Sequence, residues 1–228
     1  MRSPSSMLAT WNCSAMTSEI RPNPRKTTSI RHLGKIDIAA LRAAVLAIPE
    51  EQWDAENADK PNRFQALDAT RHILFRFPER LSDWRTGQDR PLMNDWRSLL
   101  EPVLTQATES LGYARGDYPR IMLANMAPCG VIHPHRDTNA SAKWPHKIHV
   151  PLTTNDKVRF FIEGKDYHFP EGEAVEVNNM GLHAVTNEGD TPRIHLIFEY
   201  YDRDQPEPEW LPTVLEQARL RQQAAASK

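Results

Sequence analysis

Three residues, His135, Asp137 and His183, have the types and spacing of a metal site. His135 and Asp137 stand two positions apart, so on an extended strand their side chains point to the same side. His183 follows about 46 residues after Asp137 and can complete a three-point face. Two neutral imidazoles and one carboxylate, with half of the coordination sphere left open, form the facial ligand set of non-haem Fe(II) oxygenases. The open positions would receive a co-substrate and O2.

Both histidines stand in segments that favour a turn running into a strand. Residues 127–137 are rich in Pro and Gly, and residues 178–185 place Asn and Gly before His183 and a short apolar run. Such clusters predict shaped turns rather than helices.

Two later segments share the order cation, apolar residue, His, apolar residue. In the first, Lys147 and His149 face one side of a predicted strand, and in the second, Arg193 and His195 do the same. The residues between them are apolar and can pack into a core. The polar faces need water or a ligand, because buried polar groups without partners are costly.

The order of motifs from about residue 120 to residue 202 resembles the aspartyl/asparaginyl β-hydroxylase family of 2-oxoglutarate- and Fe(II)-dependent oxygenases. The similar segments are His-Arg-Asp, Lys-Ile-His-Val-Pro-Leu, Glu-Gly-Lys, Asn-x-x-x-x-His and Pro-Arg-Ile-His-Leu. The bacterial branch that hydroxylates free proline is the most similar, because it retains the triad carboxylate that the animal peptidyl hydroxylases lack. Asp137 therefore separates this chain from the animal enzymes.

The resemblance implies roles for individual residues. His135, Asp137 and His183 would hold Fe(II), and Arg193 would bind the distal carboxylate of the co-substrate 2-oxoglutarate. His149 and Lys147 are similar to residues that contact the carboxylate nearer the metal. The reaction would release succinate and CO2 and hydroxylate an amino acid or a peptidyl Asp, Asn or Pro residue, with a free amino acid favoured by Asp137.

For three further side chains, two alternative roles stay open. His195 either orients Arg193 or is structural. Arg136 and Arg76 could meet a substrate carboxylate, although we expect both to be exposed to solvent.

The fold implied by the resemblance is mainly β, a double-stranded β-helix (a cupin-like jelly roll) with flanking α-helices. Short β-rich runs such as 159–163 and 174–177, separated by turn signals, independently favour a sandwich or barrel. We expect a disordered tail over residues 1–28 and one domain over 29–228, with its core at about 120–202. Helices are predicted over 37–48, 94–110 and 212–225, and a strand over 71–77.

Three alternatives remain open. His133, His135 and Asp137 form a His-x-His-x-Asp string like that of metallo-β-lactamase-type hydrolases, although Thr138 stands where those enzymes continue with His. A zinc cupin could use His133 and His135 within the same fold. A non-catalytic jelly-roll binding module would leave the intact triad and Arg193 unexplained.

Composition narrows the class of protein. A net charge of −2 and a pI near 6.5 give no footprint for nucleic acid or an anionic membrane surface. The mean hydropathy of −0.62 and the lack of a long apolar stretch predict no membrane span. Cys13 and Cys129 do not make a disulfide framework, which favours a cytoplasmic protein. We expect Cys129 to be a small buried residue rather than an iron ligand, and translation could start at Met16.

Overall fold

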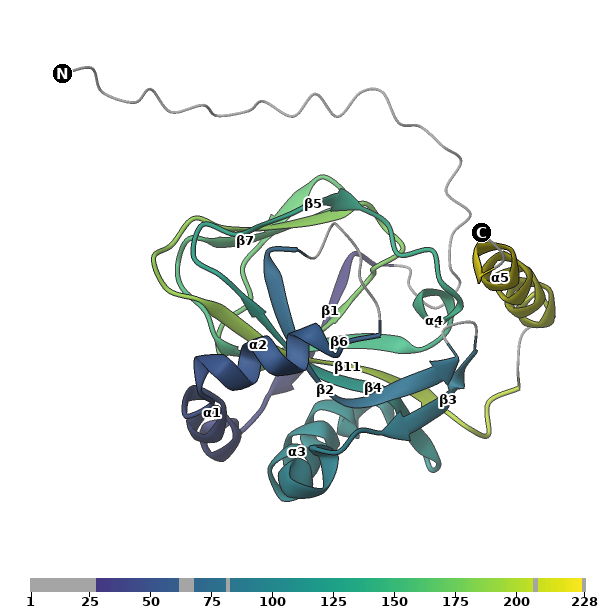
Figure 1. Cartoon of the computed structure of the whole chain (residues 1–228), viewed down its shortest axis with the longest axis horizontal. Helices are drawn as coiled ribbons and strands as arrows, with labels where there is room; N and C mark the ends of the chain where they lie inside the picture. Colours follow the sequence, from purple (N-terminus) through teal and green to yellow (C-terminus); the bar gives the residue numbers. More distant parts are fainter. Residues whose placement is uncertain (1–27, 62–67, 81–82, 207–208, 227–228) are drawn as a thin grey trace, which may run out of the picture.

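A computed structural model describes residues 28–61, 68–80, 83–206 and 209–226. Within these residues two antiparallel sheets face each other, and Figure 1 shows the smaller sheet above the larger one. The mainly β fold expected from the short strands is confirmed. The N-terminal tail expected over residues 1–28 lies, apart from Thr28, outside the described residues.

The larger sheet has seven strands, in the spatial order β1 (Ile30–Lys35), β9 (Glu173–Val177), β6 (His146–Thr153), β11 (Arg193–Asp202), β4 (Gly116–Met126), β2 (Thr70–Arg80) and β3 (Asp83–Asp89). The smaller sheet has four strands, in the order β5 (Val131–His135), β10 (His183–Asn187), β7 (Val158–Ile162) and β8 (Lys165–Tyr167). The helices are α1 (Ala39–Leu46), α2 (Glu50–Ala58), α3 (Met93–Thr108), α4 (Ala140–Lys143) and α5 (Leu211–Ala226).

The larger sheet has one face toward the helices and one toward the smaller sheet. In Figure 1, α1 and α3 lie on the side of the larger sheet that is away from β5 and β7. Ile148 and Leu196 point to the helix side and join a core that includes Leu100 of α3, all fully buried. Each such side chain stabilises the fold by about 1.5–3 kcal/mol. The intervening residues of the same strands point into the space between the sheets, as the period of two requires.

The predicted elements are found with small shifts at their ends. The helix expected over 37–48 is α1, the helix over 94–110 is α3, the helix over 212–225 is α5, and the strand over 71–77 lies inside β2. The 3-10 turn that follows α3 ends at Gly112, which has a left-handed φ of 66°.

Cys129 is not buried, contrary to the expectation from its apolar neighbours. It is exposed and free, with a positive φ of 56° in the turn between β4 and β5. The Gly130 amide donates a hydrogen bond to the Ala127 carbonyl and closes this turn, which turns Cys129 outward.

No helix in the described ranges is long and apolar enough to cross a membrane.

Candidate active site

The structure brings His135, Asp137 and His183 together at one end of the smaller sheet. One ligand atom from each lies within 4.8 Å of the other two. His135 ends β5 and His183 begins β10, and the two residues are direct partners in the register of these strands. Asp137 is held next to them because its backbone amide donates a 2.9 Å hydrogen bond to the Asn179 carbonyl. The residues that follow β5 and the turn that precedes β10 thus position the three side chains.

In both triad histidines, Nδ1 forms a hydrogen bond with a backbone carbonyl. Nδ1 of His135 lies 2.8 Å from the His133 carbonyl, and Nδ1 of His183 lies 3.0 Å from the Gly181 carbonyl. A carbonyl only accepts, so each Nδ1 carries a proton, and in the neutral ring Nε2 keeps its lone pair. Burial lowers the pKa of His183 to about 4, which keeps it neutral at physiological pH. Neutral imidazoles with a free Nε2 are the form that binds a divalent metal.

Asp137 is prepared as an ionised ligand. Its Oδ2 accepts hydrogen bonds from Lys147 Nζ at 2.9 Å and from Asn179 Nδ2 at 2.8 Å. Burial opposes ionisation, but the Lys147 ammonium and His183 hold the pKa of this carboxyl well below its usual range. The other oxygen, Oδ1, lies 3.8 Å from His135 Nε2 and is left to face the same point. The donor set therefore fits Fe(II) bound to one face.

Arg193 lies deep between the sheets at the start of β11. It is 2% exposed, with its guanidinium carbon 5.2 Å from the centre of the Phe160 ring. Its Nη1 lies 3.8 Å from Met126 Sδ, and among the described residues its Nε has no hydrogen-bond partner and no carboxylate forms an ion pair with it. Burial lowers the pKa of Arg193 to about 9. A buried cation without an anion is costly, so this position suits an anionic ligand.

His149 and His195 share the inward face predicted for them. Their Nδ1 atoms are 3.4 Å apart, and His195 stacks on Phe160 with ring centroids 5.5 Å apart. Burial lowers the pKa of both rings well below 6.5, so both are neutral. Nε2 of His195 is buried without a hydrogen bond in the described structure.

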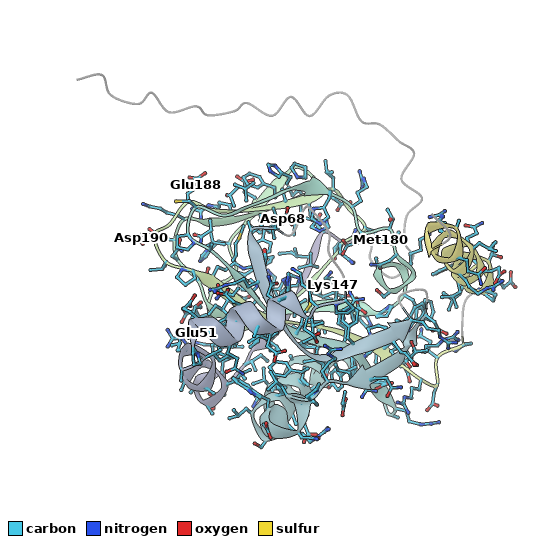
Figure 2. The ribbon with its side chains drawn as sticks, in the orientation of Figure 1. Glu51, Asp68, Lys147, Met180, Glu188 and Asp190 are labelled. Atoms are coloured by element: carbon cyan, nitrogen blue, oxygen red, sulfur yellow. The ribbon has the colours of Figure 1, made fainter. Side chains whose placement is uncertain are left out.

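Three residues considered from the sequence lie outside this centre. His133 is exposed, and the contact that connects it to the triad is its backbone carbonyl. Arg136 donates to the carbonyl of Met180, a residue labelled in Figure 2. Arg76 is paired with Asp89 of the neighbouring strand β3 at 2.6 Å.

Sequence reasoning missed three side chains near the triad. Asn179, which binds Asp137, lies inside the Asn-x-x-x-x-His motif but had no role assigned. Arg120 and Glu199 form a buried ion pair on the inward face of β4 and β11. Extending the period of two from Arg193 along β11 would have placed Glu199 on that face.

Comparisons with known proteins agree with this geometry. A family model described as aspartyl/asparaginyl beta-hydroxylase matches residues 97–203, which include the triad and Arg193. No curated protein shows significant similarity to the chain. The resemblance to that family is thus confirmed over the matched segment.

Solved structures share the fold at low sequence identity. A 2-oxoglutarate–Fe(II) oxygenase family oxidoreductase from Burkholderia pseudomallei is 16% identical, with a TM-score of 0.51 over 75% of this chain and 84% of its own. The non-heme alpha ketoglutarate dependent epimerase SnoN from nogalamycin biosynthesis is 14% identical, with a TM-score of 0.50 over 76% of this chain and 78% of its own. These likenesses confirm the jelly-roll fold with flanking helices.

Proposed function

We propose that this 2-oxoglutarate- and Fe(II)-dependent oxygenase hydroxylates an amino acid, and that a free amino acid is preferred over a residue within a peptide. The observation that carries the proposal is the buried Arg193 guanidinium. It has no anionic partner in the described structure, and it lies on the strand face that leads to the His-Asp-His cluster. A dicarboxylate co-substrate satisfies that cation and can still reach the metal.

Each site residue then has one task. His135, Asp137 and His183 hold Fe(II) through Nε2 and Oδ1 atoms, and the open face remains for co-substrate and O2. Arg193 binds the distal carboxylate of 2-oxoglutarate, because its planar fork suits two-point recognition. His149 contacts the nearer carboxylate.

Lys147 acts on the metal site through Asp137. Its ammonium holds Oδ2, so the carboxylate stays ionised and presents Oδ1 to the ion. Figure 2 labels Lys147 near the middle of the ribbon, on β6 of the larger sheet. We also propose that the Lys147 ammonium contacts the carboxylate of 2-oxoglutarate nearer the metal.

The overall reaction balances with one O2. Iron with its co-substrate supplies the oxidising power: 2-oxoglutarate becomes succinate and CO2 with one oxygen atom, and the other atom enters a substrate C–H bond as a hydroxyl. The protein's contribution is to fix which C–H bond faces the metal and to exclude water.

Three alternatives are weaker on this geometry. The zinc cupin and the metallohydrolase both need His133 as a ligand, yet His133 is exposed and outside the ligand cluster found in the described residues. A binding module without turnover would have no use for an open-sided ligand set beside an unpaired buried cation. We also propose a cytoplasmic location, supported by the absence of a disulfide framework in the sequence.

The test is a coupled measurement of three quantities. Fe(II)-loaded protein is incubated with 2-oxoglutarate, O2 and a panel of the free protein amino acids, and succinate, O2 uptake and products heavier by one oxygen atom are followed. Succinate and hydroxylated product should form together and vanish in Asp137→Ala. Turnover that needs neither O2 nor 2-oxoglutarate would refute the proposal.

A further inference from the structure

The inward face of the larger sheet carries a second charged group next to the triad. Arg120 of β4 and Glu199 of β11 are direct partners across the strands, with Nη1 and Oε1 3.1 Å apart. They are 8% and 2% exposed. On its other side Glu199 is the register partner of Lys147, the residue that holds Asp137. The pair is therefore one strand from the metal ligands.

This ion pair is incompletely satisfied. Ser141 of α4 donates to Glu199 Oε1 at 3.1 Å, and the Arg120 guanidinium lies 4.8 Å from the centre of the Phe77 ring. Arg120 Nε and Glu199 Oε2 have no hydrogen-bond partner within the described residues. A buried ion pair often stabilises a fold no better than apolar residues of similar size, and unmatched polar atoms add to its cost. Stability alone therefore gives no reason for this pair.

An apolar strip separates the pair from the co-substrate end. Leu74, Met122 and Ile197 are register partners on β2, β4 and β11, and they pack together in a cluster of their own. Along β11 the inward positions run Arg193, His195, Ile197 and Glu199. Arg193 and Glu199 are thus roughly 20 Å apart on an extended strand. Lys147, which holds the candidate metal ligand Asp137, lies at the Glu199 end of this row.

We infer that Arg120 and Glu199 determine substrate specificity by binding both charged groups of a free amino acid. The guanidinium binds the carboxylate, the Glu199 carboxylate binds the ammonium, and the substrate side chain lies against Leu74, Met122 and Ile197. A donor and an acceptor held side by side match a zwitterion, whereas a peptidyl residue has neutral amides at these places. This inference rests on the proposed function and adds the substrate-recognition residues to it.

The first test uses substrate derivatives on the wild-type holoenzyme. The best substrate among the free amino acids is compared with its N-acetyl and carboxamide forms, and succinate and hydroxylated product are measured. Loss of one charged hydrogen bond should lower kcat/KM about 10- to 100-fold for each derivative. Equal use of all three forms would overturn the inference, and so would 2-oxoglutarate consumption without hydroxylation of any free amino acid.

The second test asks whether the preference depends on the pair. Glu199→Gln should lower the ratio of kcat/KM for the free form over the N-acetyl form by about 10-fold or more, because a neutral amide no longer favours an ammonium. Arg120→Lys should lower the preference over the carboxamide in the same way. Arg203→Gln breaks the exposed Arg203–Asp117 ion pair and serves as the matched control with an unchanged ratio.

Folding is checked by the melting temperature and by 2-oxoglutarate affinity, measured by titration under anaerobic conditions. Unchanged preference ratios in Glu199→Gln and Arg120→Lys would overturn the inference while leaving the proposed function intact. Failure of the wild type to bind or consume 2-oxoglutarate would instead remove the proposed function, and the inference with it.

Discussion

In the proposed metal site, Lys147 supports the ligand Asp137 without being a ligand itself. Its ammonium and Asn179 bind the same oxygen of Asp137, so the other oxygen is oriented toward the two histidines. Loss of such a supporting contact typically weakens metal affinity 10- to 100-fold. Lys147→Met should therefore weaken Fe(II) affinity by about this factor, measured by anaerobic titration. Lys147→Arg, which keeps a cation, should recover much of the affinity. Equal affinity in wild type and Lys147→Met would show that Asp137 needs no such support.

Arg193 is predicted to lower the stability of the metal-free protein and to bind the co-substrate. Arg193→Met removes a buried cation that has no carboxylate partner among the described residues, so the metal-free variant should melt at the same or a higher temperature. Its affinity for 2-oxoglutarate should fall at least about 100-fold, since a charged two-point contact is lost. The 2-oxoglutarate affinity of Arg193→Lys should lie between those of the wild type and Arg193→Met, because Lys keeps the charge but not the planar fork. Unchanged affinity in Arg193→Met would remove Arg193 from the co-substrate site.

Single residues were predictable from the sequence where their signal is local. The two-residue spacing of His135 and Asp137, and the strand alternation that pairs Arg193 with His195, need only the geometry of an extended chain. Predicting the Arg120–Glu199 pair would have required the register between β4 and β11, which no local pattern specifies. Cys129 was mispredicted because its outward direction depends on a turn conformation with positive φ.

At the scale of elements, the predicted helices α1 and α3 each have one clearly apolar face, whereas α2, which was not predicted, has none. α1 buries Leu41 and Val45 on one face, and α3 buries a row that includes Leu100 and Leu104. α2 is largely charged and buries Trp53 as its one fully covered residue, so its sequence lacks a helical apolar stripe. β1 is an edge strand with exposed residues at most positions, so its sequence has no clear alternation of apolar and polar residues. Its extended conformation depends on pairing with β9.

The C-terminal helix is expected to stabilise α4, the segment that follows Asp137. Leu211 of α5 is fully buried in a cluster with Trp84, Trp144 and Tyr201, and Figure 1 shows α5 beside α4. α4 carries Ser141, which contacts Glu199. Leu211→Ala should lower the free energy of unfolding by about 2–5 kcal/mol, because it leaves a cavity.

The matched control for this prediction is Leu220→Ala in the same helix, where the side chain is 51% exposed. Its effect should stay within about 0.5 kcal/mol, as for most surface substitutions. Urea denaturation of both variants gives the comparison. Equal effects would mean that α5 does not dock through Leu211.

At the scale of the whole molecule, the space between the sheets holds three cations in the described structure, Lys147, Arg120 and Arg193. Lys147 and Arg120 have carboxylate partners in Asp137 and Glu199, while Arg193 has none among the described residues and is the proposed co-substrate ligand. His149, His183 and His195 in the same space are neutral, because burial lowers the pKa of each ring. The proposed function thus places its ligands in an interior that is electrostatically unfavourable without them.

Because this interior contains buried neutral histidines, we expect the metal-free protein to lose stability in acid. Burial, followed by the Lys60 ammonium, lowers the pKa of His72 to about 3, and burial also lowers the pKa of His149 and His195 well below 6.5. In the unfolded chain these rings titrate near 6.5, so the unfolded state binds protons first as the pH falls. Their contribution is fully present above pH 6.5 and, for His72, is lost progressively down to about pH 3.

Each buried neutral histidine should cost about 1.4 kcal/mol per pH unit in that window. Three such rings can remove most of a typical stability of about 5–15 kcal/mol within two pH units, so unfolding is expected well above the range in which carboxylates protonate. His72→Gln should reduce the slope of unfolding free energy against pH by about 1.4 kcal/mol per unit between pH 6 and pH 4. Urea denaturation of the wild type and His72→Gln at several pH values measures both slopes. Parallel slopes would show that His72 is not held neutral in the folded state.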